Sequence, residues 1–163
     1  MGSESNDAER VIRRIDGAPW LPHGRAEVVL SEVIPRPVGL VRVLVRRGGE
    51  VYCTPREDGR QDIPTRQVPV NDPHGSATVA RLATELGIAP ESLRPLGFVR
   101  NIVSPPALDY PWPMPLAHFA VWTSAEQPTG PGLWVAESEL RDRHWYPLLG
   151  PAQPPQGWRV RAT

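Results

Sequence analysis

The sequence predicts a domain that combines β-strands with one well-defined α-helix. Three observations support this prediction: alternating apolar residues over 38–46, a Gly-Gly turn after them, and a helical apolar period over 76–86. With 163 residues, of which 40% are hydrophobic and 22% charged, the chain is long enough to bury one core. We therefore expect a flexible segment at 1–25, a single domain at 26–150 and a Pro-rich flexible tail at 151–163.

The first half of the chain is expected to form mainly strands. Its polar beginning, residues 1–16, is predicted to be disordered or weakly helical. Strands are predicted over 26–34, 38–46 and 51–54, followed by a charged loop over 56–62. Within the second strand, Val41, Val43 and Val45 share one side and make it fully apolar. Gly48-Gly49 then marks the turn of a hairpin.

The clearest helix prediction is Ser76–Leu86. Its apolar residues recur at i, i+3, i+4 and i+7 and form one face, Ser76 suits the N-cap, and Gly87 suits a left-handed C-terminal cap. Further strands are expected over 96–103 and 118–123, an extended segment over 133–135, and a short helix or turn over 137–142. The Pro-rich segment 104–116 is expected to form a long loop.

Composition excludes several broad classes of function. The chain has 18 basic and 18 acidic residues, and this balance does not favour nucleic acid or an anionic membrane as a partner. All basic residues are Arg, which is typical of a GC-rich bacterial genome. The single cysteine, Cys53, excludes an internal disulfide framework and is expected to be buried in a strand. No secretory or membrane-spanning run follows the N-terminus, so we expect a cytoplasmic protein.

The segment from Ile63 to Ile88 resembles the Nudix box, whose pattern is G-x5-E-x7-R-E-U-x-E-E-x-G-U with U apolar. Laid without gaps on residues 66–88, four specified positions match: Leu82, Glu85, Gly87 and Ile88. Asp72 stands at the place of the first Glu. The order of predicted elements over roughly 38–148 is also similar to that of the family. The resemblance implies an α/β/α sandwich with a mixed β-sheet.

Other box positions depart from the pattern. Arg66 replaces the leading Gly, Ala80 the conserved Arg, and Arg81 and Thr84 two of the acids that hold magnesium in the family. A guanidinium is permanently charged, so Arg81 at such a position would repel Mg²⁺ instead of binding it. At about 4 Å and an effective dielectric of 20, two unit charges interact by roughly 4 kcal/mol, and a divalent ion doubles that.

Two functions follow from the resemblance. In the first, the protein has lost magnesium-dependent diphosphate hydrolysis, needs no cofactor, and binds a small anionic or nucleotide-like ligand, with Arg66 and Arg81 engaging the anion. In the second, it is a divergent hydrolase of a nucleoside or sugar diphosphate. The resemblance then implies Asp72 and Glu85 as metal ligands for Mg²⁺, with Glu85 catalytic. We favour the first function, in which the protein is not an enzyme.

Three further residues are candidates for the ligand site. Arg56 ends the hairpin strand near the expected cleft and suits an anion or a surface ion pair. Trp112 lies in the long Pro-rich loop and suits either a lid over an aromatic ligand or packing on the sheet; the loop also makes a homodimer contact plausible. His118 begins a strand and suits an acid or base facing the cleft, although a structural histidine is favoured on general grounds.

Overall fold

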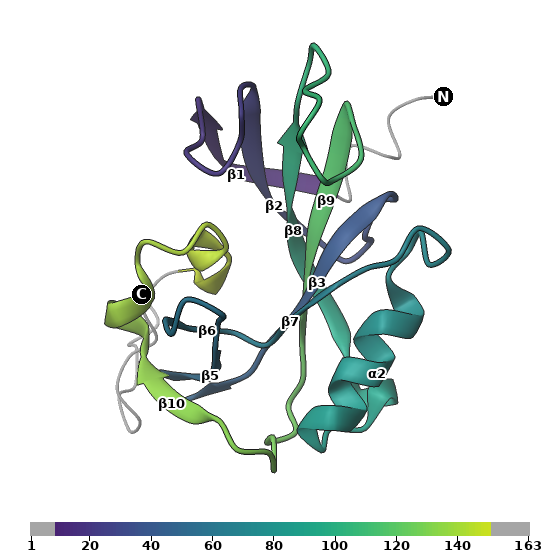
Figure 1. Ribbon diagram of the computed structural model, residues 1–163. Helices are drawn as coiled ribbons and strands as arrows, with labels where there is room; N and C mark the ends of the chain where they lie inside the picture. Colours follow the sequence, from purple (N-terminus) through teal and green to yellow (C-terminus); the bar gives the residue numbers. More distant parts are fainter. Residues whose placement is uncertain (1–8, 151–163) are drawn as a thin grey trace, which may run out of the picture.

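The main feature of the fold is a six-stranded sheet in the order β1-β2-β8-β9-β3-β7 (Figure 1). The computed structural model describes residues 9–150. The strands of this sheet are β1 (Glu9–Asp16), β2 (Arg25–Ser31), β3 (Val38–Leu44), β7 (Thr65–Gln67), β8 (Arg94–Ile102) and β9 (Leu116–Thr123). All neighbouring pairs are antiparallel except β3 and β9, which run parallel. The predicted mixed sheet is therefore confirmed.

A smaller sheet is built on the predicted hairpin. It contains β4 (Arg46–Arg47), β5 (Glu50–Pro55), β6 (Gln61–Asp62) and β10 (Leu133–Ala136). Strand β5 is central, because it pairs antiparallel with β4, β6 and β10. The hairpin turn at Gly48-Gly49 lies where the sequence predicts it, with φ of +52° at Gly48. Cys53 is buried on β5, as expected, and burial raises the pKa of its thiol to about 12.

The described residues contain one α-helix, α2 (Ser76–Leu86), at the predicted position. Gly87 ends it with φ of +78°, and its amide donates to the Thr84 carbonyl oxygen (3.1 Å). The predicted N-cap is wrong, because Gly75 occupies that position with φ of +72° and Ser76 is already helical. The other helical segments are short 3-10 turns: η1 (Pro90–Ser92), η2 (Glu137–Leu140) and η3 (Tyr146–Leu149).

Two layers of apolar side chains cover the two faces of the large sheet. Strand β3 serves both layers: Val41 and Val43 pack with the apolar face of α2, whereas Leu44 points into the opposite layer. That opposite layer is closed by η2, η3 and Trp145, so α2 and the 3-10 segment lie on different sides of the sheet (Figure 1). Each fully buried Val or Leu contributes about 1.5–3 kcal/mol. The alternation of β3 thus determines which side faces the helix.

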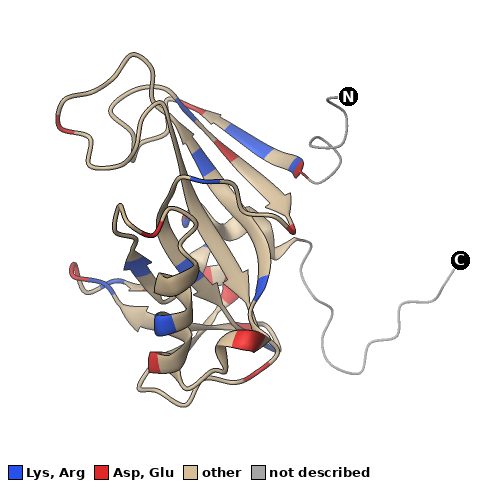
Figure 2. Ribbon diagram, turned by 90° about the vertical axis from the view of Figure 1, so that its right-hand side faces the viewer, with Lys and Arg blue, Asp and Glu red and all other residues tan. Residues whose placement is uncertain are grey.

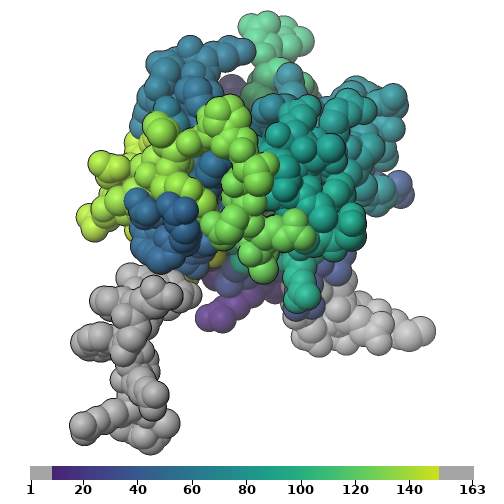
Figure 3. All heavy atoms as spheres, turned by 90° about the horizontal axis from the view of Figure 1, so that it is seen from below, coloured from purple at the N-terminus to yellow at the C-terminus, as the bar shows by residue number. Residues whose placement is uncertain are grey.

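The connection from β9 to β10 crosses the C-terminal end of α2. Figure 3 shows this yellow-green segment against the teal atoms of α2. The amide of Thr129 donates to the Leu86 carbonyl oxygen (2.9 Å), and Gly87 lies so close to Thr129 that a β-carbon there would meet Oγ1 at 1.9 Å. The segment that leads from β9 into β10 of the smaller sheet therefore packs against the C-terminal end of α2.

One prediction for the N-terminal part is wrong. Residues 9–16 form β1, an edge strand that pairs with β2 over its length, and are neither disordered nor helical. The ordered fold therefore begins before residue 26. Residues 1–8 and the predicted tail at 151–163 lie outside the described residues. Within residues 9–150, no helix has the length and apolar character to cross a membrane.

Candidate functional site

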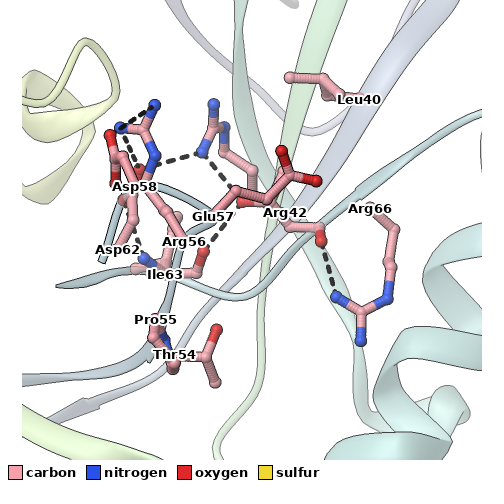
Figure 4. A pocket seen from close by; sticks show the side chains of 11 residues that line it. Leu40, Arg42, Thr54, Pro55, Arg56, Glu57, Asp58, Asp62, Ile63 and Arg66 are labelled. Carbon is pink, nitrogen blue, oxygen red and sulfur yellow. Dashed lines mark hydrogen bonds and ion pairs between the residues drawn. The ribbon is translucent and has the colours of Figure 1, made fainter. Parts of the chain in front are cut away.

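A cleft of about 560 Å³ opens beside β3, between β7 and the loop that joins β5 to β6 (Figure 4). Its walls are formed by Leu40, Arg42, Thr54, Pro55, Arg56, Glu57, Asp58, Asp62, Ile63, Thr65 and Arg66. The volume is in the range of small-molecule sites. Three of the wall residues are arginines and come from three different strands or strand ends, so guanidinium groups border the cleft on several sides.

Arg42 forms the inner part of this site. It lies in the middle of β3, between buried valines, and only 6% of its surface is exposed. Its Nη1 donates to Thr65 Oγ1 (2.9 Å) and forms an ion pair with Asp62 Oδ2 (3.4 Å). Its Nη2 lies 3.1 Å from His144 Nε2. Burial lowers the pKa of Arg42 to about 10, and Asp62 opposes that shift. The side chain stays charged at neutral pH.

Asp62 is the buried counter-ion of the cluster. Its Oδ1 accepts hydrogen bonds from Trp145 Nε1 and from the Ile63 amide, both at 2.8 Å. Besides Arg42, two more guanidinium groups lie near its carboxylate: Arg56 Nη1 at 3.7 Å and Arg143 Nε at 3.9 Å. One buried carboxylate therefore faces three cations.

The charges of this cluster do not balance in the interior. The side chains of Arg42 and Arg143 are 7% and 9% exposed, and the only carboxylate buried with them in the described residues is Asp62, at 4%. Arg143 also pairs with Asp142, but that carboxylate is 60% exposed. The Nε atoms of both arginines are buried without a hydrogen-bond partner in the described part of the chain. Because the two buried cations share one buried anion, a further anionic group beside Arg42, which lines the cleft, would be favourable.

Two of the predicted ligand-binding residues, Arg56 and Arg66, lie on this cleft. Arg56 is half exposed and contacts Asp58 (4.0 Å) as well as Asp62. Arg66 Nη2 donates to Glu85 Oε2 (2.8 Å), across the gap between β7 and α2. The resemblance places Arg66 and Glu85 in one box, and the structure pairs them directly.

The other three predicted ligand-binding residues are not on this cleft. Arg81 is exposed on α2, and residues 9–150 provide no ion-pair partner for it. Trp112 packs back onto the sheet, edge to face with Phe119 (centroids 5.3 Å apart), and borders a separate cavity of about 150 Å³. His118 is buried in β9, between the Pro37 carbonyl oxygen (3.0 Å from Nδ1) and Arg100 Nε (3.2 Å from Nε2). Burial lowers the pKa of His118.

The two carboxylates expected to hold magnesium in the hydrolase alternative are far apart. Asp72 binds the start of α2, where its carboxylate accepts from the Thr78 amide (2.9 Å) and hydroxyl (2.8 Å). Glu85 lies near the other end, about 10 Å further along the helix axis at 1.5 Å per residue. One Mg²⁺ ion, with ligand distances of about 2.1 Å, does not join them. Residues 9–150 also lack a cluster of three or more His, Cys, Asp or Glu side chains that would hold a metal.

The capping role of Asp72 gives a testable pH dependence. Burial raises the pKa of Asp72, but hydrogen bonds from Thr78 and Ala77 outweigh it, so the pKa lies below its ordinary value. The stabilisation is thus complete above about pH 4 and is lost as the pH falls through the folded-state pKa. We expect Asp72→Ala to cost about 1 kcal/mol at pH 7 by urea unfolding, and less below pH 4. Asp72→Asn retains a side-chain acceptor at the start of α2 and should remove only the pH dependence of stability. An equal cost of Asp72→Ala at all pH values would contradict the capping role of Asp72.

Sequence reasoning did not single out Arg42, Arg143 or His144 as site residues. Arg42 had a local signal, because it is a lone charge within an otherwise apolar strand. Asp62 falls at the end of the charged loop predicted over 56–62, and its local sequence does not mark it as a buried counter-ion. Arg143 and His144 have no such signal, because their partners within the buried cluster lie on β3 and β6, about 80 to 100 residues earlier in the chain.

Comparison with known proteins adds no family assignment. No protein-family model matches this chain, and no curated protein matches it. The charge distribution agrees with the balanced composition: Figure 2 shows basic and acidic residues interspersed over the ribbon instead of separated onto two sides. The wall of the cleft is mixed as well, with three arginines and the three acids Glu57, Asp58 and Asp62.

Proposed function

We propose that this protein binds a small anionic ligand, one that carries a phosphate or carboxylate group, in the cleft beside β3, without a metal cofactor. The observation that carries the proposal is the buried cluster in which Arg42 and Arg143 share one buried carboxylate, Asp62, while the second partner of Arg143, Asp142, is exposed. Arg56 and Arg66 add two half-exposed guanidinium groups at the entrance. Guanidinium groups match the geometry of phosphate and carboxylate oxygens.

We also infer that the fold is a divergent Nudix-like sandwich. Supporting this inference, β7 leads through a loop into α2, and Gly87 caps that helix at the place where the box requires a glycine. The proposed change in chemistry is supported by the pairing of Glu85, a metal-holding position in the Nudix family, with Arg66 at 2.8 Å. A carboxylate already paired with a guanidinium is a poor magnesium ligand, which favours ligand binding over hydrolysis.

Sulfate tests the binding proposal, because it is an anion that does not titrate near neutral pH. We expect calorimetry to detect sulfate binding to the wild-type protein without added metal. Arg56→Gln should weaken it about tenfold, since a hydrogen bond to a charged group is worth about 1.5–3 kcal/mol and Arg56 is half exposed. Arg81→Gln is the matched control, because Arg81 is an arginine outside the cleft. An equal loss in both variants, or no binding to the wild-type protein, would exclude this cleft.

A divergent diphosphate hydrolase is the second candidate. It is favoured by Glu57 and Asp58, two acids on the wall of the same cleft that can complement a reduced set of metal ligands. The test is phosphate release from nucleoside and sugar diphosphates with Mg²⁺ or Mn²⁺ present. Turnover that disappears in Glu85→Gln would replace the binding proposal with this one.

A further inference from the structure

The orientation of Arg42 depends on a residue behind it. A guanidinium group has five N–H donors and no acceptor, and it holds one orientation only when several donors are engaged. Within residues 9–150, Nη1 of Arg42 is engaged by Thr65 and Asp62, and Nη2 by His144 alone. The Nε atom has no partner in the described residues. His144 is therefore the contact that determines the direction of Nη2.

The contact with Arg42 also determines the state of the His144 ring. Because Arg42 only donates, His144 Nε2 must accept, so Nε2 carries no proton and the neutral ring has its proton on Nδ1. The ring is held between Trp20 and Phe119, with centroids 5.0 and 5.9 Å away. These aromatic contacts leave the imidazole little freedom to turn away from Arg42.

The surroundings of His144 favour the neutral form. Burial is the largest cause that lowers its pKa, followed by the charges of Arg42 on β3, Arg56 after β5 and Arg143 beside it in sequence. Asp62, the buried carboxylate of the cluster, pairs with these arginines, and among the described residues it forms no ion pair with the imidazole. Trp20 and Phe119 are uncharged. A neutral acceptor at this point is thus compatible with every group that faces it.

We propose that His144 is a positioning residue for the ligand site: as a neutral acceptor behind Arg42, it holds the guanidinium toward the cleft in which the anionic group binds. The inference rests on the proposed function, because it concerns the same site. It assigns a role to the segment between η2 and η3, which supplies no residue to the wall of the cleft. The segment would act on the ligand only through Arg42.

Two substitutions of His144 separate the acceptor from the ring. His144→Phe keeps the aromatic contacts with Trp20 and Phe119 but removes the acceptor. His144→Gln loses the ring but places an amide oxygen at about the distance of Nε2, so it can accept from Arg42. We expect His144→Phe to weaken sulfate binding at least tenfold in calorimetry and His144→Gln to remain within about threefold of the wild-type protein. Circular dichroism and urea unfolding check that both variants are folded.

Nitrogen NMR of the wild-type protein gives a second readout that does not depend on a variant. The ¹⁵N shifts of His144 should show an unprotonated Nε2 and a protonated Nδ1 between pH 6 and 8. A proton on Nε2 would overturn the proposal. Equal sulfate affinity in the wild-type protein and His144→Phe would also overturn it. So would a loss of sulfate affinity in His144→Gln as large as that in His144→Phe. If the wild-type protein binds no sulfate, both the proposed function and the positioning role fail. If sulfate binds with an affinity that does not change when His144 is substituted, only the positioning role fails.

Discussion

Replacing Asp62 by Asn is expected to lower the free energy of unfolding by about 3–5 kcal/mol, the usual effect of removing one partner of a buried ion pair. Asn has nearly the same shape and its amide oxygen can still accept from Trp145 and Ile63. The negative charge, however, is gone. Arg42 is then a buried cation without a carboxylate partner in the described residues, and Arg143 keeps only its exposed partner, Asp142. The change thus isolates the charge of the cluster from its packing.

Urea unfolding at neutral pH measures the effect of Asp62→Asn. The matched control is Asp58→Asn, because Asp58 lines the same cleft and pairs with the same Arg56, but its side chain is 50% exposed. A half-exposed ion pair contributes about 0–1 kcal/mol, so this variant should remain close to the wild-type protein. Similar costs for the two substitutions would show that the buried charges are not the unit that stabilises the cleft. Sulfate should restore part of the stability lost in Asp62→Asn, since an added anion can pair with the same arginines.

The elements that the sequence predicts well are those whose pattern reports burial directly. In β3, alternate residues enter opposite apolar layers, and the period-two pattern therefore identifies the strand and both of its faces. In α2, the apolar stripe and Gly87 together determine the face and the end. Both predictions are confirmed because a single physical requirement, burial of one face, produced the pattern.

The elements that were missed lack such a pattern. Strand β1 is at the edge of the sheet, and half of its side chains are exposed charges, so nothing in Glu9–Asp16 alternates regularly between apolar and polar. Charged residues are a usual feature of edge strands, because they discourage pairing with other chains. What makes these residues a strand is their backbone pairing with β2, which the local sequence does not encode.

The candidate site was predicted in part, for a similar reason. Arg56 and Arg66 were expected near a cleft because they border the hairpin and the box, and both line it. The interior of the site is formed by a contact between Arg42 and His144, which are 102 residues apart. A strand and a distant 3-10 segment meet only through packing of the whole chain, and no spacing rule relates such residues. The role of Asp72 also required the fold, since a turn acid and a helix cap have the same sequence.

Truncating Trp145 is expected to have the second large effect on stability. Trp145 is fully buried in the layer opposite α2, and replacement of a buried Trp by Ala costs about 3–5 kcal/mol through lost transfer energy and the cavity that remains. The indole also donates to Asp62 Oδ1 at 2.8 Å, so Trp145→Ala removes one hydrogen bond of the buried carboxylate. Trp145→Ala should therefore destabilise the core and loosen the ligand cleft together.

Trp145→Phe separates these two contributions. It retains most of the apolar volume but cannot donate to Asp62, so its cost should approach that of a lost hydrogen bond to a charged group, about 1.5–3 kcal/mol. Trp134→Ala is the matched control for size, because Trp134 is only partly buried on β10 and contacts no residue of the cluster around Asp62. In urea unfolding, Trp145→Ala should lose the most free energy of unfolding. Trp145→Phe and Trp134→Ala should each lose less than Trp145→Ala. Sulfate affinity should fall in both Trp145 variants and stay unchanged in Trp134→Ala, because of these two residues only Trp145 contacts Asp62. An unchanged affinity in Trp145→Phe would mean that Asp62 holds its arginines in place without the indole hydrogen bond.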